Sequence, residues 1–212
     1  MEEGSIRVPR TARYHLLGEA DTARALWVVL HGYGQLARYF LRNFEGLKND
    51  LLIVAPEGLS RFYTDIGHTR VGATWMTRED RTHEIADQIS YLDLLADTVL
   101  RSCPPGTPLH VLGFSQGVAT ACRWLGLGRA HAQRLVLWGG SLPPDLPVNA
   151  WTVQLVTTHV ELVHGIKDTL VPGSVVAASE ALLRDAGIPH ETHRFDGGHE
   201  LDPFLLKRLI TA

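Results

Sequence analysis

The chain has 212 residues, of which 45% are hydrophobic and 20% are charged. This length and composition predict one globular domain covering residues 1–212 and argue against an intrinsically disordered chain. Lys and Arg number 20 and Asp and Glu number 23, which gives a formal net charge of -3. Nucleic-acid-binding proteins are usually basic or carry a basic stripe, so nucleic acid is not an expected partner.

Signals for membrane insertion, secretion and disulfide bonding are missing from the sequence pattern. No run approaches the roughly 18 apolar residues of a membrane span, so no stable membrane insertion is expected. The N-terminus, Met1 to Gly4, is acidic and lacks the positive-then-apolar order of a secretory signal. Cys103 and Cys122 are the only cysteines, and their spacing matches no zinc or redox site. The pattern predicts a cytoplasmic protein with two reduced thiols and no bound metal.

Short apolar runs rich in β-branched residues recur along the chain, and most of them end at Gly or Pro. Runs of this kind are typical of strands buried on both faces of a parallel sheet. Two less apolar segments, 13–17 and 190–195, are expected to form strands near the sheet edges. The predicted buried strands cover residues 25–30, 51–55, 109–112, 135–138 and 160–163.

Helical patterns alternate with these runs. In 83–100 the apolar side chains recur at spacings of three and four residues, which places them on one face of a helix. Further helices are expected over 116–127, 174–186 and 203–210. The alternation predicts a three-layer α/β architecture, with a mostly parallel central sheet flanked by helices. Ligands of such sheets bind at the carboxyl ends of the strands, directly after each apolar run.

A G-x-S-x-G sequence, residues 113–117, follows the strand expected at 109–112 and precedes a predicted helix. This context is typical of a tight strand-to-helix turn that exposes the serine, with small residues allowing strand and helix to pack closely. The start of the helix also points backbone N–H groups at negative charge that develops on a substrate. Ser115 is therefore the predicted nucleophile. The alternative is a structural turn that merely requires glycines.

A serine hydroxyl is a weak nucleophile and needs a histidine base. In hydrolases with such a turn, the serine is followed along the chain by the acid and then by the histidine. His199 lies in a loop between the last expected strand and the last expected helix, whereas His190 and His193 lie inside that strand. His199 is the predicted base, and the alternative role is a polar loop residue that caps the final helix.

The histidine in turn needs an acid that orients its ring. Asp168 lies in the loop after the strand expected at 160–163, where this acid belongs. Asp196 and Asp202 are so close to His199 in sequence that reaching its Nδ1 atom is awkward. Asp168 is the predicted acid, with a loop-forming role as the alternative.

Acyl transfer also needs N–H donors aimed at the oxyanion of the tetrahedral intermediate. One expected donor is the backbone N–H of Gln116, which follows the nucleophile. The second should come from the loop after an earlier strand, where residues 31–35 read HGYGQ. The N–H of Tyr33 is the preferred donor and that of Gly32 the alternative. A flexible turn without a catalytic role is the third interpretation of this segment.

Taken together, these motifs resemble the α/β-hydrolase carboxylesterase and acyl-protein thioesterase family, also called phospholipase/carboxylesterase. The resemblance implies a compact serine hydrolase without a large lid domain, acting on esters and thioesters and requiring no cofactor. It also implies the same triad and the same two oxyanion donors. The matching segments are HGYG at 31–34, GFSQG at 113–117, Gly165-x-x-Asp168-x-x-Val171-Pro172 and GHE at 198–200, with Pro56 and Trp75 between them.

Three segments depart from the family pattern. The family often has Leu at position 33 and an acidic residue at position 35, where this chain has Tyr and Gln. Residues 75–77 read WMT instead of the Trp-Phe-Asp common in the thioesterase branch. Esterase chemistry is therefore a stronger expectation than protein depalmitoylation.

The substrate pocket is expected beside a 26-residue segment, 57–82, that has weak periodicity and is long for a loop. We expect this loop to roof the site, with the alternative that its aromatic residues only pack it onto the body. The main functional hypothesis is a serine carboxylesterase acting on small to medium acyl esters. The alternatives are a thioesterase or lysophospholipase for long acyl chains, and a non-catalytic ligand-binding protein. The sequence leaves open whether the protein is a monomer or a homodimer. The predicted pocket residues are Tyr33, Tyr39, Phe40, Trp75, Met76 and Leu170.

Overall fold

The computed structural model describes residues 2, 4–47, 50–146 and 155–212. Seven strands form one sheet in the order β1-β3-β2-β6-β7-β8-β9, in which β1 is antiparallel to β3 and the other neighbours are parallel. This arrangement confirms the predicted mostly parallel sheet. The strands are β1 (Tyr14–Leu17), β2 (Ala25–Leu30), β3 (Leu51–Pro56), β6 (Leu109–Phe114), β7 (Arg134–Trp138), β8 (His159–Gly165) and β9 (His190–Phe195).

Burial along the strands explains why the central ones are visible in the sequence. Every residue of β2 and β3 is buried, because helices cover both faces of the sheet there. The edge strands β1 and β9 have no fully buried residue and alternate between exposed and half-buried positions. A strand with one solvated face keeps polar residues, so its apolar signal is weaker.

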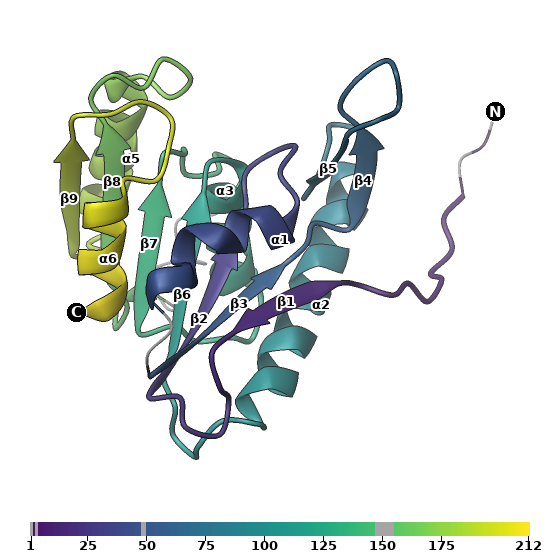
Figure 1. The fold of residues 1–212 in the computed structure, drawn as a ribbon. Coiled ribbons are helices and arrows are strands. Elements are labelled where there is room, and N and C mark those ends of the chain that lie inside the picture. Colours follow the sequence, from purple (N-terminus) through teal and green to yellow (C-terminus); the bar gives the residue numbers. More distant parts are fainter. Residues whose placement is uncertain (1, 3, 48–49, 147–154) are drawn as a thin grey trace.

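Helices cover the two faces of the sheet (Figure 1). On one face lie α1 (Ala37–Phe40), the 3-10 helix η1 (Leu41–Leu47) and α6 (Pro203–Thr211), whose core includes Phe40, Phe44 and Leu206. On the other face lie α2 (Arg81–Leu100), α3 (Gln116–Leu127) and α5 (Gly173–Asp185), packed through Leu92, Trp124 and Leu183. The three-layer α/β architecture predicted from the sequence is confirmed.

The segment 57–82 is not a structureless loop, and that expectation was wrong. It contains an antiparallel hairpin of β4 (Ser60–Tyr63) and β5 (Val71–Thr74), which projects beyond the carboxyl-end edge of the sheet (Figure 1). The hairpin tip is closed by Asp65, whose carboxylate accepts hydrogen bonds from the backbone N–H groups of Thr69 and Arg70. The strands are only four residues long, too short for a clear period in the sequence.

Three further observations concern the described part of the chain. Cys103 and Cys122 are both free thiols, and burial raises the pKa of Cys122 to about 12. Within the described ranges, no helix has the length and apolar character needed to cross a membrane. Nor do three or more His, Cys, Asp or Glu side chains of those ranges converge as metal ligands.

Candidate active site

Ser115 lies on a sharp turn between β6 and α3. Its backbone has φ 55° and ψ -116°, a left-handed conformation that is strained for a residue with a side chain. A Cβ atom at Gly113 would clash with the carbonyl of Gly117, and one at Gly117 would clash with the carbonyl of Leu30. The two glycines therefore permit the close approach of strand, helix and turn that exposes the serine.

A chain of hydrogen bonds connects three side chains that are far apart in sequence. His199 Nε2 lies 2.9 Å from Ser115 Oγ, and His199 Nδ1 lies 2.7 Å from Asp168 Oδ2. An ionised carboxylate can only accept hydrogen bonds, so Nδ1–H donates to Asp168. Nε2 is then free to accept the hydroxyl proton of Ser115. The structure thus brings the three predicted triad residues together.

The carboxylate of Asp168 is held on both oxygens. Oδ1 accepts the backbone N–H groups of Leu170 at 2.8 Å and Val171 at 2.9 Å, while Oδ2 faces His199. Burial alone would raise the pKa of Asp168, but these N–H groups and the histidine outweigh it and lower that pKa below its usual range. The carboxylate therefore stays ionised and keeps the imidazole in one orientation.

The competing residues have other partners. Asp196 forms an ion pair with Lys167 at 2.6 Å on the surface. Asp202 is the N-cap of α6, where its Oδ1 accepts the N–H of Leu205. His193 contacts the buried Glu161 from within β9. These contacts agree with the preference for Asp168 and His199.

The loop at residues 31–35 lies against Ser115. A Cβ atom built on Gly32 would be 3.1 Å from the Cβ of Ser115. The N–H of Gly32 donates to the side chain of Gln35 at 2.8 Å, so it is already occupied. Two other candidate oxyanion donors remain. One is the backbone N–H of Tyr33 in this loop, and the other is that of Gln116 at the first position of α3, where a helix offers no internal acceptor.

Strand β5 supports both of these segments, a link that the sequence analysis missed. Gly34 N–H donates to the carbonyl of Ala73, and the N–H of Ala73 donates to the carbonyl of Gln35. The amide of Gln116 donates to the Met76 carbonyl at 2.9 Å, and its oxygen accepts the N–H of Trp75 at 3.1 Å. The pairing joins residues some 40 positions apart, so no local pattern in the sequence signals it.

Two of the predicted pocket residues, Phe40 and Trp75, lie in the hydrophobic core, where they are 2% and 1% exposed. Phe40 packs on Phe44 and Phe114, while the indole of Trp75 stacks on His31 and donates to its carbonyl at 2.8 Å. Trp75 thus supports the loop at 31–35 from behind.

The other predicted pocket residues lie at the surface or are half-buried. Tyr33 is 62% exposed and packs on Phe62, and Leu170 is 73% exposed. Tyr39 contacts the guanidinium groups of Arg38 and Arg42. Met76 is half-buried, with its sulfur 3.4 Å from Arg123. Their role in substrate binding stays a prediction.

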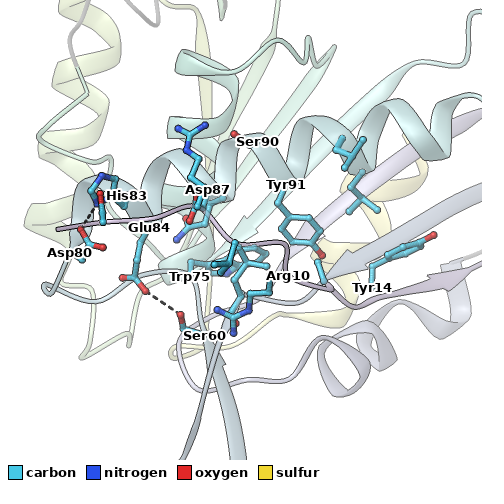
Figure 2. Close-up of a pocket in the computed structure, with 18 of the residues that line it drawn as sticks. Arg10, Tyr14, Ser60, Trp75, Asp80, His83, Glu84, Asp87, Ser90 and Tyr91 are labelled. Atoms are coloured by element: carbon cyan, nitrogen blue, oxygen red, sulfur yellow. Dashed lines mark hydrogen bonds and ion pairs between the residues drawn. The ribbon is translucent and has the colours of Figure 1, made fainter.

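A cavity of about 770 Å³ lies elsewhere, between the N-terminal segment and helix α2 (Figure 2). It is lined by Tyr91 and the acidic residues Glu84 and Asp87 of α2, with Trp75 on the side of the loop at 31–35. Ser115, Asp168, His199, Tyr33 and Gln116 do not line it. Trp75 separates the cavity from the hydrogen-bonded side chains of Ser115, His199 and Asp168. The candidate active site is therefore at the carboxyl-end edge of the sheet and not in this cavity.

The fold and this strand-turn-helix serine define the class of the protein, an α/β hydrolase. A family model described as Phospholipase/Carboxylesterase matches residues 16–211, and the chain belongs to that family. Solved structures with similar folds include esterase PE8, at 22% identity and TM-score 0.68, covering 95% of this chain and 99% of that one. Acyl-protein thioesterase 2 of Zea mays matches at 20% identity and TM-score 0.73, covering 95% of this chain and 97% of that one.

A carboxylesterase of Bacillus cereus is similar at 14% identity and TM-score 0.72, covering 94% of this chain and 92% of that one. No curated protein sequence matches the chain. At these identities the solved structures establish the fold. The reaction must be argued from the site itself.

Proposed function

We propose that the protein is a serine carboxylesterase that hydrolyses small to medium acyl esters through Ser115, His199 and Asp168. The observation that carries this proposal is the continuous hydrogen-bonded chain from Ser115 Oγ through the imidazole to Asp168. The strained turn at Ser115 supports it, because such strain persists where the surrounding structure maintains it, often at active sites.

In the proposed mechanism, Ser115 Oγ attacks the ester carbonyl carbon while His199 Nε2 takes the hydroxyl proton. The tetrahedral intermediate collapses, the bond to the alcohol oxygen breaks, and His199 returns the proton to the leaving alcohol. Water then attacks the acyl-enzyme with His199 again as base, which releases the carboxylic acid and restores Ser115. Asp168 stays ionised and stabilises the imidazolium.

The oxyanion of each intermediate is stabilised by the backbone N–H groups of Tyr33 and Gln116. The occupied N–H of Gly32 favours Tyr33 as the donor from the loop, because one N–H cannot serve both Gln35 and the oxyanion well. The first turn of α3 adds the positive end of the helix dipole at Gln116. Exposed Tyr33 and Leu170 are the proposed apolar contacts of the acyl group.

Hydrolysis of p-nitrophenyl esters from acetate to palmitate, by wild type and by Ser115→Ala, tests this proposal. We expect activity that peaks at short to medium chains and falls by at least about 10³-fold in the variant. A long acyl groove would reward each buried methylene by roughly 0.8 kcal/mol, so a peak at long chains favours a lipid esterase or thioesterase instead.

Ser179→Ala is the control for loss of a serine hydroxyl, because Ser179 is buried within α5 and donates to the Val175 carbonyl of its own helix. Its activity should equal that of wild type. If wild type and Ser115→Ala are equally inert on every ester, the esterase proposal fails and a ligand-binding role takes its place.

A further inference from the structure

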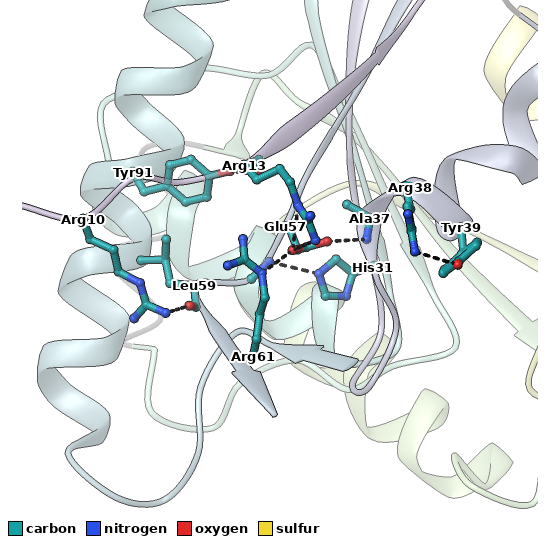
Figure 3. Close-up of polar contacts among 11 residues, drawn as sticks. Arg10, Arg13, His31, Ala37, Arg38, Tyr39, Glu57, Leu59, Arg61 and Tyr91 are labelled. Atoms are coloured by element: carbon teal, nitrogen blue, oxygen red, sulfur yellow. Dashed lines mark hydrogen bonds and ion pairs between the residues drawn. The ribbon is translucent and has the colours of Figure 1, made fainter. Parts of the chain in front are cut away.

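Glu57 is a fully buried carboxylate directly after β3, and it joins three separate segments (Figure 3). Its side chain is 0% exposed. Oε1 accepts hydrogen bonds from Arg13 at 2.6 Å and from Arg61 at 2.7 Å, while Oε2 accepts the backbone N–H of Ala37 at 3.3 Å. Arg13 precedes β1, Arg61 lies on β4, and Ala37 is the first residue of α1.

The two guanidinium groups keep this carboxylate charged. Burial alone would raise the pKa of Glu57, but Arg61 and Arg13 outweigh it and lower that pKa below its usual range. Arg13 and Arg61 are 44% and 41% exposed, so their outer nitrogens remain in contact with water. The cluster therefore holds an ionised carboxylate, and a neutral side chain at position 57 would leave the two guanidinium groups without this charged partner.

Helix α1 depends on this carboxylate for its first turn. Its N-cap is Leu36, an apolar residue that makes no side-chain capping bond. Ser, Thr, Asp or Asn would normally satisfy an N–H of the first turn from that position. Glu57 satisfies the N–H of Ala37 instead, and its negative charge lies at the positive end of the helix.

The residue after Glu57 holds the other end of the same loop. Gly58 N–H donates to His31 Nε2 at 3.0 Å, so the imidazole hydrogen lies on Nδ1, which donates to the Gly32 carbonyl at 2.7 Å. In a trans peptide the carbonyl and the next N–H point in opposite directions. Because His31 takes the Gly32 carbonyl, the N–H of Tyr33 points away from the imidazole.

We propose that Glu57 is a positioning residue that fixes the loop at 31–37, and with it the Tyr33 N–H, for oxyanion stabilisation. Glu57 and Gly58 anchor the two ends of this loop, at Ala37 and His31. Arg61 extends the anchor to the hairpin, whose β5 strand pairs with Gly34 and Gln35. The inference rests on the proposed function, because it assigns Tyr33 as an oxyanion donor.

Glu57→Gln tests this role, since the variant keeps the size of the side chain but places an NH₂ group among N–H donors. We expect kcat for the best p-nitrophenyl ester to fall about tenfold to a hundredfold, less than for outright loss of one oxyanion donor. KM should change less than about twofold, because the loop acts on the transition state more than on the bound ester. The Ki of a trifluoromethyl ketone, which forms a tetrahedral adduct with serine, should rise by a similar factor to the fall in kcat.

Glu161→Gln is the matched control. Glu161 is also a buried carboxylate with an arginine partner, 2% exposed and 2.9 Å from Arg134, but it lies near the opposite end of its strand from the site. Its loss should lower the midpoint of thermal unfolding while leaving kcat, KM and Ki unchanged. Equal kinetic effects of the two variants would mean that Glu57 acts only through overall stability, which overturns the proposal.

Hydrogen exchange measured on peptides covering residues 31–37 gives a readout that needs no activity. Glu57→Gln should speed exchange there relative to peptides of β6, and Glu161→Gln should not. Unchanged exchange in the loop overturns the positioning role. If exchange is faster in Glu57→Gln but the wild-type protein hydrolyses no ester, the anchoring role is supported and the proposed function is rejected, so the two failures are distinguishable.

Discussion

The two ends of the same parallel strands carry buried charge in different ways. Towards the amino ends, Glu161 of β8 contacts Arg134 of β7 on one side and His193 of β9 on the other. At the carboxyl ends, the corresponding positions continue into loops, and the hydrogen bonds run from Asp168 through His199 to the hydroxyl of Ser115.

The difference lies in what positions the charged groups. Regular strand pairing fixes the amino-end cluster, because the register places Arg134 opposite His159, two residues before Glu161, and Glu161 opposite Glu191, two residues before His193. Residues two positions apart lie on the same face of a strand, so these side chains are diagonal neighbours. The carboxyl-end groups lie on loops and need support from outside the central sheet, such as the contact of β5 with Gln116 through Thr74 and the contact of Glu57 with the loop at 31–37. We therefore expect the amino-end cluster to contribute to stability, whereas under the proposed function the carboxyl-end groups carry out the chemistry, with backbone strain at Ser115.

Among variants that distinguish the carboxyl ends of the strands from the amino ends, Asp168→Asn is expected to have the largest effect on kcat. The amide nitrogen would face Nδ1 and favour the wrong imidazole tautomer, so kcat should fall by about 10³- to 10⁴-fold. Stability should change little if the remaining oxygen keeps the N–H groups of Leu170 and Val171. Steady-state kinetics and thermal unfolding on the same samples measure both quantities.

Asp196→Asn is the control for that variant, because Asp196 lies three residues from His199 but pairs only with exposed Lys167. It should keep wild-type kcat. A larger loss in Asp196→Asn than in Asp168→Asn would transfer the role of the acid to Asp196.

An intermediate effect is expected from Gly165→Ala at the end of β8. The new Cβ would clash with the carbonyls of Gly197 and Gly198, which directly precede His199. A displacement of the base by about 1 Å can cost about 10²-fold in rate, so we expect a loss of that order in kcat. Gly46→Ala is the control, because a Cβ there meets no atom within 4 Å. Unchanged kinetics in Gly165→Ala would mean that the His199 loop shifts without consequence.

The smallest effect concerns pH and the amino-end region. Burial, with the charges of Arg134 and Arg24, lowers the pKa of His110 in β6 from 6.5 to about 4. As pH falls, the imidazole of His110 is protonated in the unfolded chain before it is protonated in the folded one. The free energy of unfolding therefore decreases as pH falls from 6.5 towards 4. Buried His31 has a pKa lowered by burial and acts in the same direction.

Thermal unfolding from about pH 7 to about pH 4.5 measures this slope, above the range where the carboxylates with lowered pKa values start to contribute. His110→Gln should flatten the slope, whereas His131→Gln, at an exposed position, should leave it as in wild type. An unchanged slope in His110→Gln would assign the pH dependence to other groups.

Local sequence determined the central strands and the position of the proposed nucleophile, Ser115. Apolar runs such as 25–30 form buried strands because both faces of the sheet are covered. Every residue of such a strand is therefore apolar, which makes the strand recognisable in the sequence. The G-x-S-x-G sequence indicates part of its own geometry, since Gly113 is required by its contact with Gly117 across the turn, whereas Gly117 is required by the carbonyl of Leu30 in the neighbouring strand β2. The expected order along the chain, serine then acid then histidine, limits the predicted acid and histidine to the late loops.

Only the tertiary structure decided what surrounds these residues. The hairpin at 60–74, the burial of Phe40 and Trp75 in the core, and the bonds from Glu57 to Arg13, Arg61 and Ala37 all depend on segments distant along the chain. The period of a strand or helix records which face is buried, but not which partner a polar side chain will meet there. The partners of polar side chains are fixed only when distant segments pack together, and in this protein those contacts hold the loops at the carboxyl ends of the strands.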